Sequence, residues 1–218
     1  AITDQMQDNF EERFIEDGIE GAILSTFAPE KMVEVFRARK IPVVIVNDEL
    51  PAKHTGYIID DNYGGAKKMM AHLIDECGYQ SVAFVSNRLS HTSNMLRYIG
   101  YLDALDERKL QPYRSSQLPQ YDLVGRVKEY NRTPLAHFGL TEIPRRGSPV
   151  ILRDLSPQAA FEGVQPLLDC SELPRAIFCT ADSIAVGIIK AIHHRGLRVP
   201  EDIAVCGYAA MEIAALAE

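Results

Sequence analysis

The residues best placed for ligand chemistry in this sequence are three polar side chains that lie close together, His91, Ser93 and Arg97. Ser93 and Arg97 are four residues apart, which places them on one face of a helix predicted over residues 93–104. A guanidinium group holds paired oxygens well because its N–H groups form a planar fork. We therefore expect a site for a polar ligand group at the start of this helix, with a surface ion pair of Arg97 as the alternative.

A second group of candidates lies near the carboxyl terminus, around an apolar run over residues 176–178 that predicts a short buried strand. A polar loop with Ala181 and Asp182 follows, then a helix over 183–194 and a second strand over 203–205 before Tyr208 and Ala209. Strand, helix and strand in this order form a parallel βαβ unit. Open α/β sheets bind ligands at the carboxyl ends of such strands, and Asn47 follows another apolar strand in the same way.

The rest of the chain repeats this alternation of strands and helices. Apolar runs that fit strands buried on both faces occur at residues 21–25, 41–46, 81–85 and 150–152, with an extended segment at 56–59. Further helices are predicted at 3–17, 29–38, 63–76 and 157–168. We predict an α/β fold of two lobes with doubly wound parallel sheets, residues 1–78 and 79–212, with the boundary near Gly78 and the start of a crossover at 213–218.

The segment over residues 107–148 interrupts the alternation. It combines proline with arginine, glutamine and tyrosine, shows no clear period, and is too long for an ordinary connection. We interpret it as a surface excursion, with a dedicated interaction arm as the alternative.

Composition describes an ordinary globular chain with an acidic balance. The net charge of −7 over 218 residues argues against direct DNA contact, because phosphate binding needs clustered Lys and Arg. No apolar run approaches the roughly 20 residues of a membrane span, and the acidic segment 1–16 lacks the apolar core of a signal peptide. The four cysteines form no CxxC pair and fit buried free thiols in a reducing cytoplasm better than a disulfide or metal site.

Motifs typical of catalysis are missing from the sequence. It contains no GxSxG, HExxH, P-loop or EF-hand pattern, and the adjacent His193 and His194 point about 100° apart on a helix. Gly64 and Gly65 lack the context of a phosphate-binding loop, so we favour close backbone packing there over a phosphate site. We expect no enzyme activity, no cofactor and no metal site.

Several stretches resemble the LacI/GalR family of bacterial transcription regulators. The most distinctive is AIFCTADSIAVG at 176–187, which continues after the helix as RGLRVPEDIAVCGY at 195–208. Others are GIEGAILS at 18–25, RKIPVVIVN at 39–47, DNYGGA at 61–66 with HLI at 72–74, YQSVAFV at 79–85 and SHTSNMLRYIGY at 90–101. The resemblance covers most of the chain apart from 107–148. It implies two lobes of the type I periplasmic-binding-protein kind that close on a small-molecule effector.

The resemblance also implies which residues face the cleft between the lobes. Arg97 would hold the effector's polar group with help from Ser93 and His91, and Asn47 would contribute from the first lobe. Tyr63 and Leu155 would form walls, although a plain core leucine is the alternative for position 155. The expected site residues are Asn47, Tyr63, His91, Ser93, Arg97, Leu155, Ala181, Asp182, Tyr208 and Ala209.

The sequence departs from the family pattern in two places. Ala181 stands where the family commonly has Asn, and Ala209 and Ala210 stand where one or two Asp commonly follow the aromatic residue. Those polar side chains normally hold hydroxyl-rich effectors through hydrogen bonds worth about 0.5–1.5 kcal/mol each. The effector expected from this sequence is therefore less polar than a pyranose sugar, held by other residues, or absent.

We therefore expect the effector-sensing and dimerisation core of a cytoplasmic LacI/GalR-type regulator. Its operator DNA would be bound by a head domain outside these residues, and further residues would complete both lobes, because the family's first lobe has a strand before the opening helix. The alternative is an exported solute-binding protein for a transporter, which shares the two-lobed architecture. An enzyme on the same scaffold is a third alternative.

Overall fold

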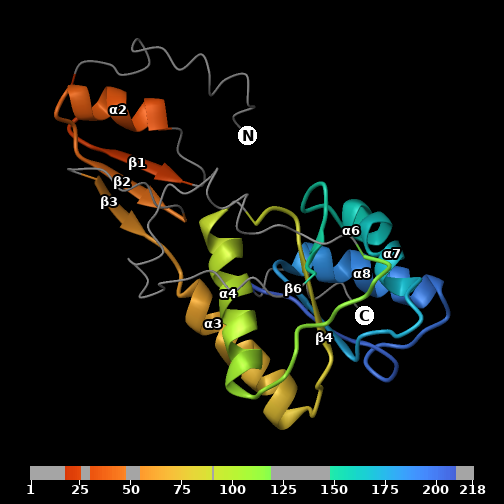
Figure 1. Ribbon diagram of the computed structural model, residues 1–218. Coiled ribbons are helices and arrows are strands. Elements are labelled where there is room, and N and C mark those ends of the chain that lie inside the picture. Colours follow the sequence, from red (N-terminus) through yellow and green to blue (C-terminus); the bar gives the residue numbers. More distant parts are fainter. Residues whose placement is uncertain (1–17, 26–29, 48–54, 90, 119–147, 210–218) are drawn as a thin grey trace. The chain divides into compact units, whose positions relative to one another are not determined.

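The computed structural model describes residues 18–25, 30–47, 55–89, 91–118 and 148–209 (Figure 1). The described residues form two compact units that divide between Asp61 and Asn62. Every strand pair in both units is parallel. The predicted α/β class with parallel sheets is therefore confirmed. The expected helix at 3–17, the crossover at 213–218 and most of the excursion at 107–148 lie outside the described residues.

The first unit is a three-stranded sheet with strand order β1-β2-β3. Its elements are β1 (Ala22–Ser25), α2 (Glu30–Ala38), β2 (Val43–Val46) and β3 (Thr55–Ile58). Each lies within two residues of the expected position. The strands have only four residues each, but every residue of β2 has a partner in both β1 and β3.

The two faces of this sheet differ in the described residues. Phe36 of α2 packs against Ile45 of β2, so the helix covers one face. Successive strand residues point to opposite faces, which assigns Ile23 and Ile58 to the other face. Their side chains are 77% and 63% exposed.

The second unit is a four-stranded parallel sheet with strand order β5-β4-β6-β7. Its strands are β4 (Val82–Ser86), β5 (Val150–Ile151), β6 (Ala176–Cys179) and β7 (Ala204–Cys206). Its helices are α3 (Asn62–Ala71), α4 (Thr92–Glu107), α6 (Pro157–Gly163), α7 (Gln165–Leu168) and α8 (Asp182–His194).

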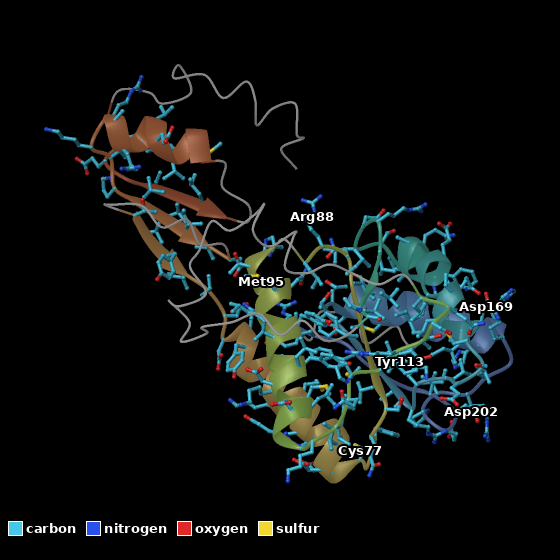
Figure 2. The ribbon with its side chains drawn as sticks, in the orientation of Figure 1. Cys77, Arg88, Met95, Tyr113, Asp169 and Asp202 are labelled. Carbon is cyan, nitrogen blue, oxygen red and sulfur yellow. The ribbon has the colours of Figure 1, made fainter. Side chains whose placement is uncertain are left out.

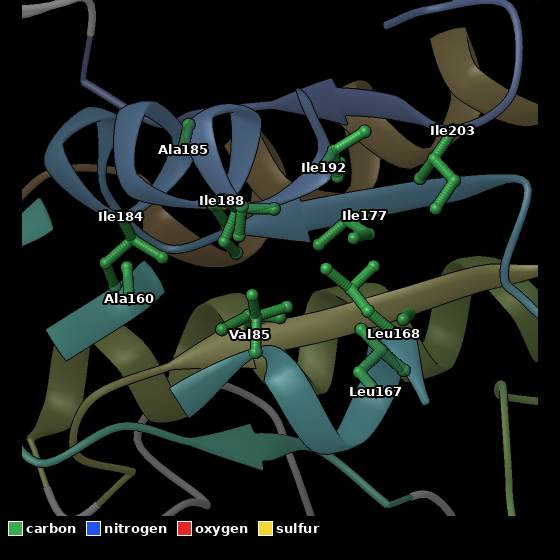
Figure 3. Close-up of a cluster of buried hydrophobic side chains, with 14 of the residues drawn as sticks. Val85, Ala160, Leu167, Leu168, Ile177, Ile184, Ala185, Ile188, Ile192 and Ile203 are labelled. Atoms are coloured by element: carbon green, nitrogen blue, oxygen red, sulfur yellow. The ribbon is translucent and has the colours of Figure 1, made fainter. Parts of the chain in front are cut away.

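One face of this sheet packs against α6, α7 and α8. Figure 3 shows Val85 and Ile177 from two neighbouring strands among Leu167 and Ile188 from the helices. These side chains are 0% exposed. Burial of this kind contributes about 1.5–3 kcal/mol for each large aliphatic side chain, which makes this cluster the main stabilising core of the unit.

The opposite face packs against α4 through aromatic rings. Phe84 lies 4.9 Å from Tyr98 and 5.2 Å from Tyr101 between ring centroids, and Phe178 lies 5.4 Å from Phe84. The Tyr101 hydroxyl donates a hydrogen bond of 2.8 Å to the carbonyl of Val82. This bond offsets the free-energy cost of burying the hydroxyl group. Because helices cover both faces, β4 and β6 read in the sequence as continuous apolar runs.

Helices α3 and α4 approach each other closely at Gly100. A Cβ atom at this position would lie 2.6 Å from the carbonyl oxygen of Tyr63 and 3.0 Å from the Cβ of Ala66. This packing groups α3 with the second unit. The lobe boundary was expected near Gly78, whereas the two units divide before α3.

The helix expected over 63–76 is confirmed in extent, because the chain stays helical from α3 through Glu76, whereas the helix expected over 157–168 is interrupted. The helix expected over 63–76 ends in a π turn, η2 (His72–Glu76). The helix expected over 157–168 breaks at Val164, and α7 then begins with a proline, Pro166, in its first turn. Proline lacks a backbone N–H, so it starts a helix more easily than it continues one.

We expect Gly100→Ala to lower the free energy of unfolding by about 1–3 kcal/mol, because the added methyl group meets the backbone of α3. Urea unfolding measures this change. Lys68→Ala, on the exposed side of α3, is the control and should change stability by less than about 0.5 kcal/mol. Equal unfolding midpoints for the two variants would contradict the close approach at Gly100.

The turn before β7 contains an ion pair whose effect depends on pH. Arg198 Nη2 lies 2.9 Å from Asp202 Oδ1, and the Arg198 backbone N–H donates to Asp202 Oδ2 at 2.8 Å. These bonds from Arg198 lower the pKa of Asp202 to about 2. Since the folded-state pKa is below the ordinary value of 3.8, the carboxylate stabilises the fold above about pH 4 and loses this effect as the pH falls toward 2.

Asp202→Asn should therefore melt at a lower temperature than the parent chain at neutral pH, with a difference that shrinks on acidification and vanishes below about pH 2. Thermal unfolding at several pH values measures this dependence. Glu201→Gln, at the exposed neighbouring position, is the control. A difference that stays constant with pH would show that the Asp202 carboxylate does not act through its charge.

Candidate functional site

Buried polar side chains gather at the carboxyl edge of the second unit's sheet. Ser86 ends β4 and Thr180 directly follows β6. Asn62 begins α3, Asn94 lies in the first turn of α4, and Asp182 begins α8. These five are the buried polar or charged residues in the described part of the chain. Helix starts and strand ends meet at this edge because the strands are parallel, so the fold itself concentrates polar groups here.

Arg97 connects three segments at this edge. Its Nε donates to Asn62 Oδ1 at 2.8 Å, and its Nη1 donates to the carbonyl oxygen of Thr180 at 2.5 Å. Its guanidinium carbon lies 3.9 Å from the centroid of the Tyr208 ring, a cation–π distance. One side chain of α4 thereby links the start of α3, the end of β6 and the segment after β7.

The Tyr208 ring is fixed on more than one side. Besides the guanidinium of Arg97, it stacks on Phe178 with ring centroids 6.3 Å apart and planes inclined by 22°. A Cβ atom at Gly65 would lie 2.1 Å from the Tyr208 hydroxyl oxygen. Position 65 is therefore glycine because the tyrosine occupies the space of a side chain, which agrees with the close packing favoured for this glycine pair.

Hydrogen bonds also hold the loops around the edge. The hydroxyl of Thr180 donates to that of Ser86 at 3.1 Å, joining the ends of β6 and β4. The Asn94 amide donates to Asn87 Oδ1 and to the Arg88 carbonyl, each at 3.0 Å. The loop after β4 is thus tied to the first turn of α4.

Ser86, Asn94, Thr180 and Asn62 were not among the site residues expected from the sequence. Each of these residues stands at a strand end or a helix start. That position is a usable signal, because a polar residue directly after a buried strand faces the ligand-binding edge of a parallel sheet.

The other candidates from α4 stand at its beginning. His91 precedes the helix, and its carbonyl accepts the first helical hydrogen bond from Met95 at 3.0 Å, while its side chain makes no capping bond. Ser93 is half-buried in the first turn. Ser93 therefore lies about one turn before Arg97, and His91 lies nearly two turns before it, toward the same edge.

The candidates around α8 and β7 pack against each other. Ala181 precedes α8 with extended backbone, and Asp182 is buried at its first position. The space of a Cβ at Gly207 is taken by Asp182 Oδ1, 2.1 Å away, so the carboxylate lies against the backbone after β7. Ala209 follows with a φ of 101°, a conformation strained for alanine.

Tyr63 and Leu155, the two expected wall residues, differ in their surroundings. The Tyr63 hydroxyl donates to Asp103 of α4 at 2.9 Å, and burial together with this bond raises the pKa of the phenol. Leu155 is 46% exposed in the loop after β5, so it is not a plain core leucine. Its carbonyl accepts a 2.7 Å bond from the hydroxyl of Ser183 in α8.

Asn47 belongs to the first unit. It follows β2 with a φ of 62°, and its backbone N–H donates to the carbonyl of Ile58 at 2.9 Å. Its side chain is exposed. The other candidates lie in the second unit, and a site shared with Asn47 stays a prediction.

The four cysteines are free thiols with different exposure. Cys170 and Cys179 are buried, Cys206 is partly buried and Cys77 is exposed. Burial raises the pKa of Cys206 to about 12 and that of Cys179 well above its usual range, which makes both poor nucleophiles. Within the described ranges, no group of three or more His, Cys, Asp or Glu side chains could hold a metal ion. No helix there is long and apolar enough to cross a membrane.

A parallel sheet with polar groups at its carboxyl edge is typical of α/β proteins that bind small molecules at that edge. The model of the periplasmic binding protein-like domain family matches residues 70–218. Since this match covers more than half of the chain, the protein belongs to that family.

Similar proteins include repressors. The chain is 28% identical over 176 residues to the HTH-type transcriptional repressor PurR of Actinobacillus pleuropneumoniae, covering 81% of this chain and 42% of the relative. It is 30% identical over 168 residues to PurR of Haemophilus influenzae, covering 77% of this chain and 40% of the relative. The chain thus spans about two fifths of the length of these relatives.

A solved structure of a transcriptional regulator, the CelR–cellobiose complex, has a similar fold. It superimposes with a TM-score of 0.71 at 18% identity, covering 97% of this chain and 55% of the other. At this identity the likeness shows the fold alone.

Arg97→Met should lower the free energy of unfolding by about 1–3 kcal/mol, because it leaves Asn62 Oδ1 and the Thr180 carbonyl without their guanidinium donor. Chemical denaturation measures the loss. Arg108→Met is a matched control on the same helix, where the arginine forms an exposed ion pair with Asp75 and should contribute at most about 1 kcal/mol. Equal losses in the two variants would contradict the bridging role of Arg97.

Proposed function

We propose that this chain is the effector-sensing and dimerisation core of a LacI/GalR-type transcription regulator. The observation that carries the proposal is the convergence of Arg97, Asn62, Thr180 and Tyr208 at the carboxyl edge of a parallel sheet, in a chain of the periplasmic binding protein-like domain family. The relatives named as HTH-type repressors support regulation over transport.

In this proposal a small molecule binds between two lobes and changes their angle. Arg97 holds its polar group, because the guanidinium is already fixed in orientation by the protein and costs little further ordering on binding. We place one hinge at Asp61–Asn62, where the two units divide. The remaining assigned residues are Asn47, Tyr63, His91, Ser93, Leu155, Ala181, Asp182, Tyr208 and Ala209.

The regulator would be a cytoplasmic homodimer that binds operator DNA through a head domain, and it would not be an enzyme. Binding of effector to one lobe arrangement more tightly than to another would shift the spacing of two heads. The exported solute-binding protein is the alternative, and the two differ in what accompanies the core. A helix-turn-helix segment in the longer gene product supports regulation, whereas a signal peptide supports export.

A thermal-shift screen tests the ligand site. Sugars, sugar phosphates, nucleobases and amino acids are the probes, and a ligand at about 100 times its Kd stabilises the native state by about 2.7 kcal/mol. We expect a shift with one class that is lost in Arg97→Ala and kept in Arg108→Ala, each measured against the variant's own baseline. Undiminished affinity in Arg97→Ala would contradict the assignment of Arg97, and no shift with any class would contradict a small effector.

A DNA-binding assay tests the regulatory role. The 218-residue chain alone should not retard DNA at physiological salt, because its net charge is −7. The full-length gene product should retard a fragment of its own promoter, and the ligand from the screen should change that retardation. A full-length protein that binds the ligand but no DNA would support the transport alternative.

A further inference from the structure

The π turn at the end of α3 brings together two side chains that the proposed function does not use. The turn spans His72–Glu76, and the Cys77 backbone N–H closes it by donating to the His72 carbonyl at 3.0 Å. Side chains five residues apart in an α-helix point about 140° away from each other. A backbone hydrogen bond from residue i+5 to residue i brings these two side chains to the same side of the turn. Such turns are rare and occur frequently at functional sites.

As a result, Cys77 Sγ lies 3.5 Å from His72 Nε2. Thiolate and imidazole are the ligands that Zn²⁺ prefers in proteins, with bonds of about 2.3 Å to sulfur and about 2.0 Å to nitrogen. At a tetrahedral angle, two such bonds place sulfur and nitrogen about 3.5 Å apart. The pair therefore already has the spacing that one tetrahedral metal ion requires.

A carboxylate orients the imidazole for this role. His72 Nδ1 lies 2.9 Å from Glu76 Oε2, so the ring N–H is held by Glu76. This leaves Nε2, the nitrogen 3.5 Å from the Cys77 sulfur, as the one with a free lone pair. Metal-binding histidines usually donate their other ring N–H to a carboxylate or carbonyl in this way. The structure thus contains a thiol, an imidazole and an orienting carboxylate within one turn.

Cys77 and His72 are accessible to solvent, and the neighbouring Asp75 is bound to an arginine. Cys77 is exposed and the His72 side chain is 54% exposed, and Figure 2 labels Cys77 at the end of α3. Asp75 is held by Arg108, whose Nε donates to it at 2.8 Å. The described part of the chain offers no third protein ligand at this place.

We propose that His72 and Cys77 form a two-ligand site for Zn²⁺ or a chemically similar thiophilic ion, oriented by Glu76 and completed by solvent. The site lies on the second unit at the end of α3 where the chain enters β4. It is independent of the effector site, because neither residue lies at the carboxyl edge of the sheet.

Co²⁺ titration of the full chain, reduced and desalted without thiols, tests the site. We expect a sulfur-to-cobalt charge-transfer absorption that Zn²⁺ abolishes by displacement. Cys77→Ser should remove this absorption, and Glu76→Gln should weaken Co²⁺ binding about 10–100-fold. His72→Gln should weaken it more than Glu76→Gln, because it removes a ligand. Cys206→Ser is the matched control and should leave the absorption unchanged.

A second measurement uses the unmodified chain. Zn²⁺ should slow alkylation of Cys77 by iodoacetamide, as followed by peptide mass spectrometry, and His72→Gln should lose most of this protection. Charge-transfer absorption that persists in Cys77→Ser or disappears in Cys206→Ser would overturn the proposal. Alkylation of Cys77 at the same rate with and without Zn²⁺ would overturn it as well.

Discussion

The guanidinium of Arg97 satisfies a need that the parallel sheet creates. Where β6 ends, the carbonyl of Thr180 leaves the strand ladder in a buried position, and a buried acceptor without a donor costs about 1–3 kcal/mol. Arg97 supplies that donor and at the same time bonds Asn62 and covers the Tyr208 ring. The same charge that stabilises the second unit is therefore the charge expected to meet a ligand. A substitution of Arg97 is therefore expected to change both the stability of the second unit and ligand binding.

The architecture was largely predictable because burial on both faces leaves a simple pattern. Runs such as VAFVS and AIFC became β4 and β6 almost residue for residue. The local interruptions were not predictable from apolar spacing. The π turn after Ala71 contains a backbone hydrogen bond from the Cys77 N–H to the His72 carbonyl, five residues back instead of four. The grouping of α3 with the second unit depends on how closely Gly100 lets α3 and α4 approach each other.

The candidate site was predictable only in part. The resemblance to the LacI/GalR family selected Arg97, Asp182 and Tyr208, and helical spacing supported Arg97 independently. They could not reveal that Arg97 bonds residues 35 and 83 positions away in the sequence. Nor could they reveal that the hydroxyl of Tyr63, which the resemblance assigns to a wall of the cleft, is bonded to Asp103 on the neighbouring helix.

The contact between Gly65 and Tyr208 makes a residue without a side chain a determinant of where the positive charge sits. Any substituent at position 65 must push the phenol ring aside, and the guanidinium that rests on the ring would have to follow. A substitution at this neutral position on α3 would therefore move the charge while every polar residue at the edge stays the same. Position 65 thus sets the place of a charged group without carrying a charge or a side chain of its own.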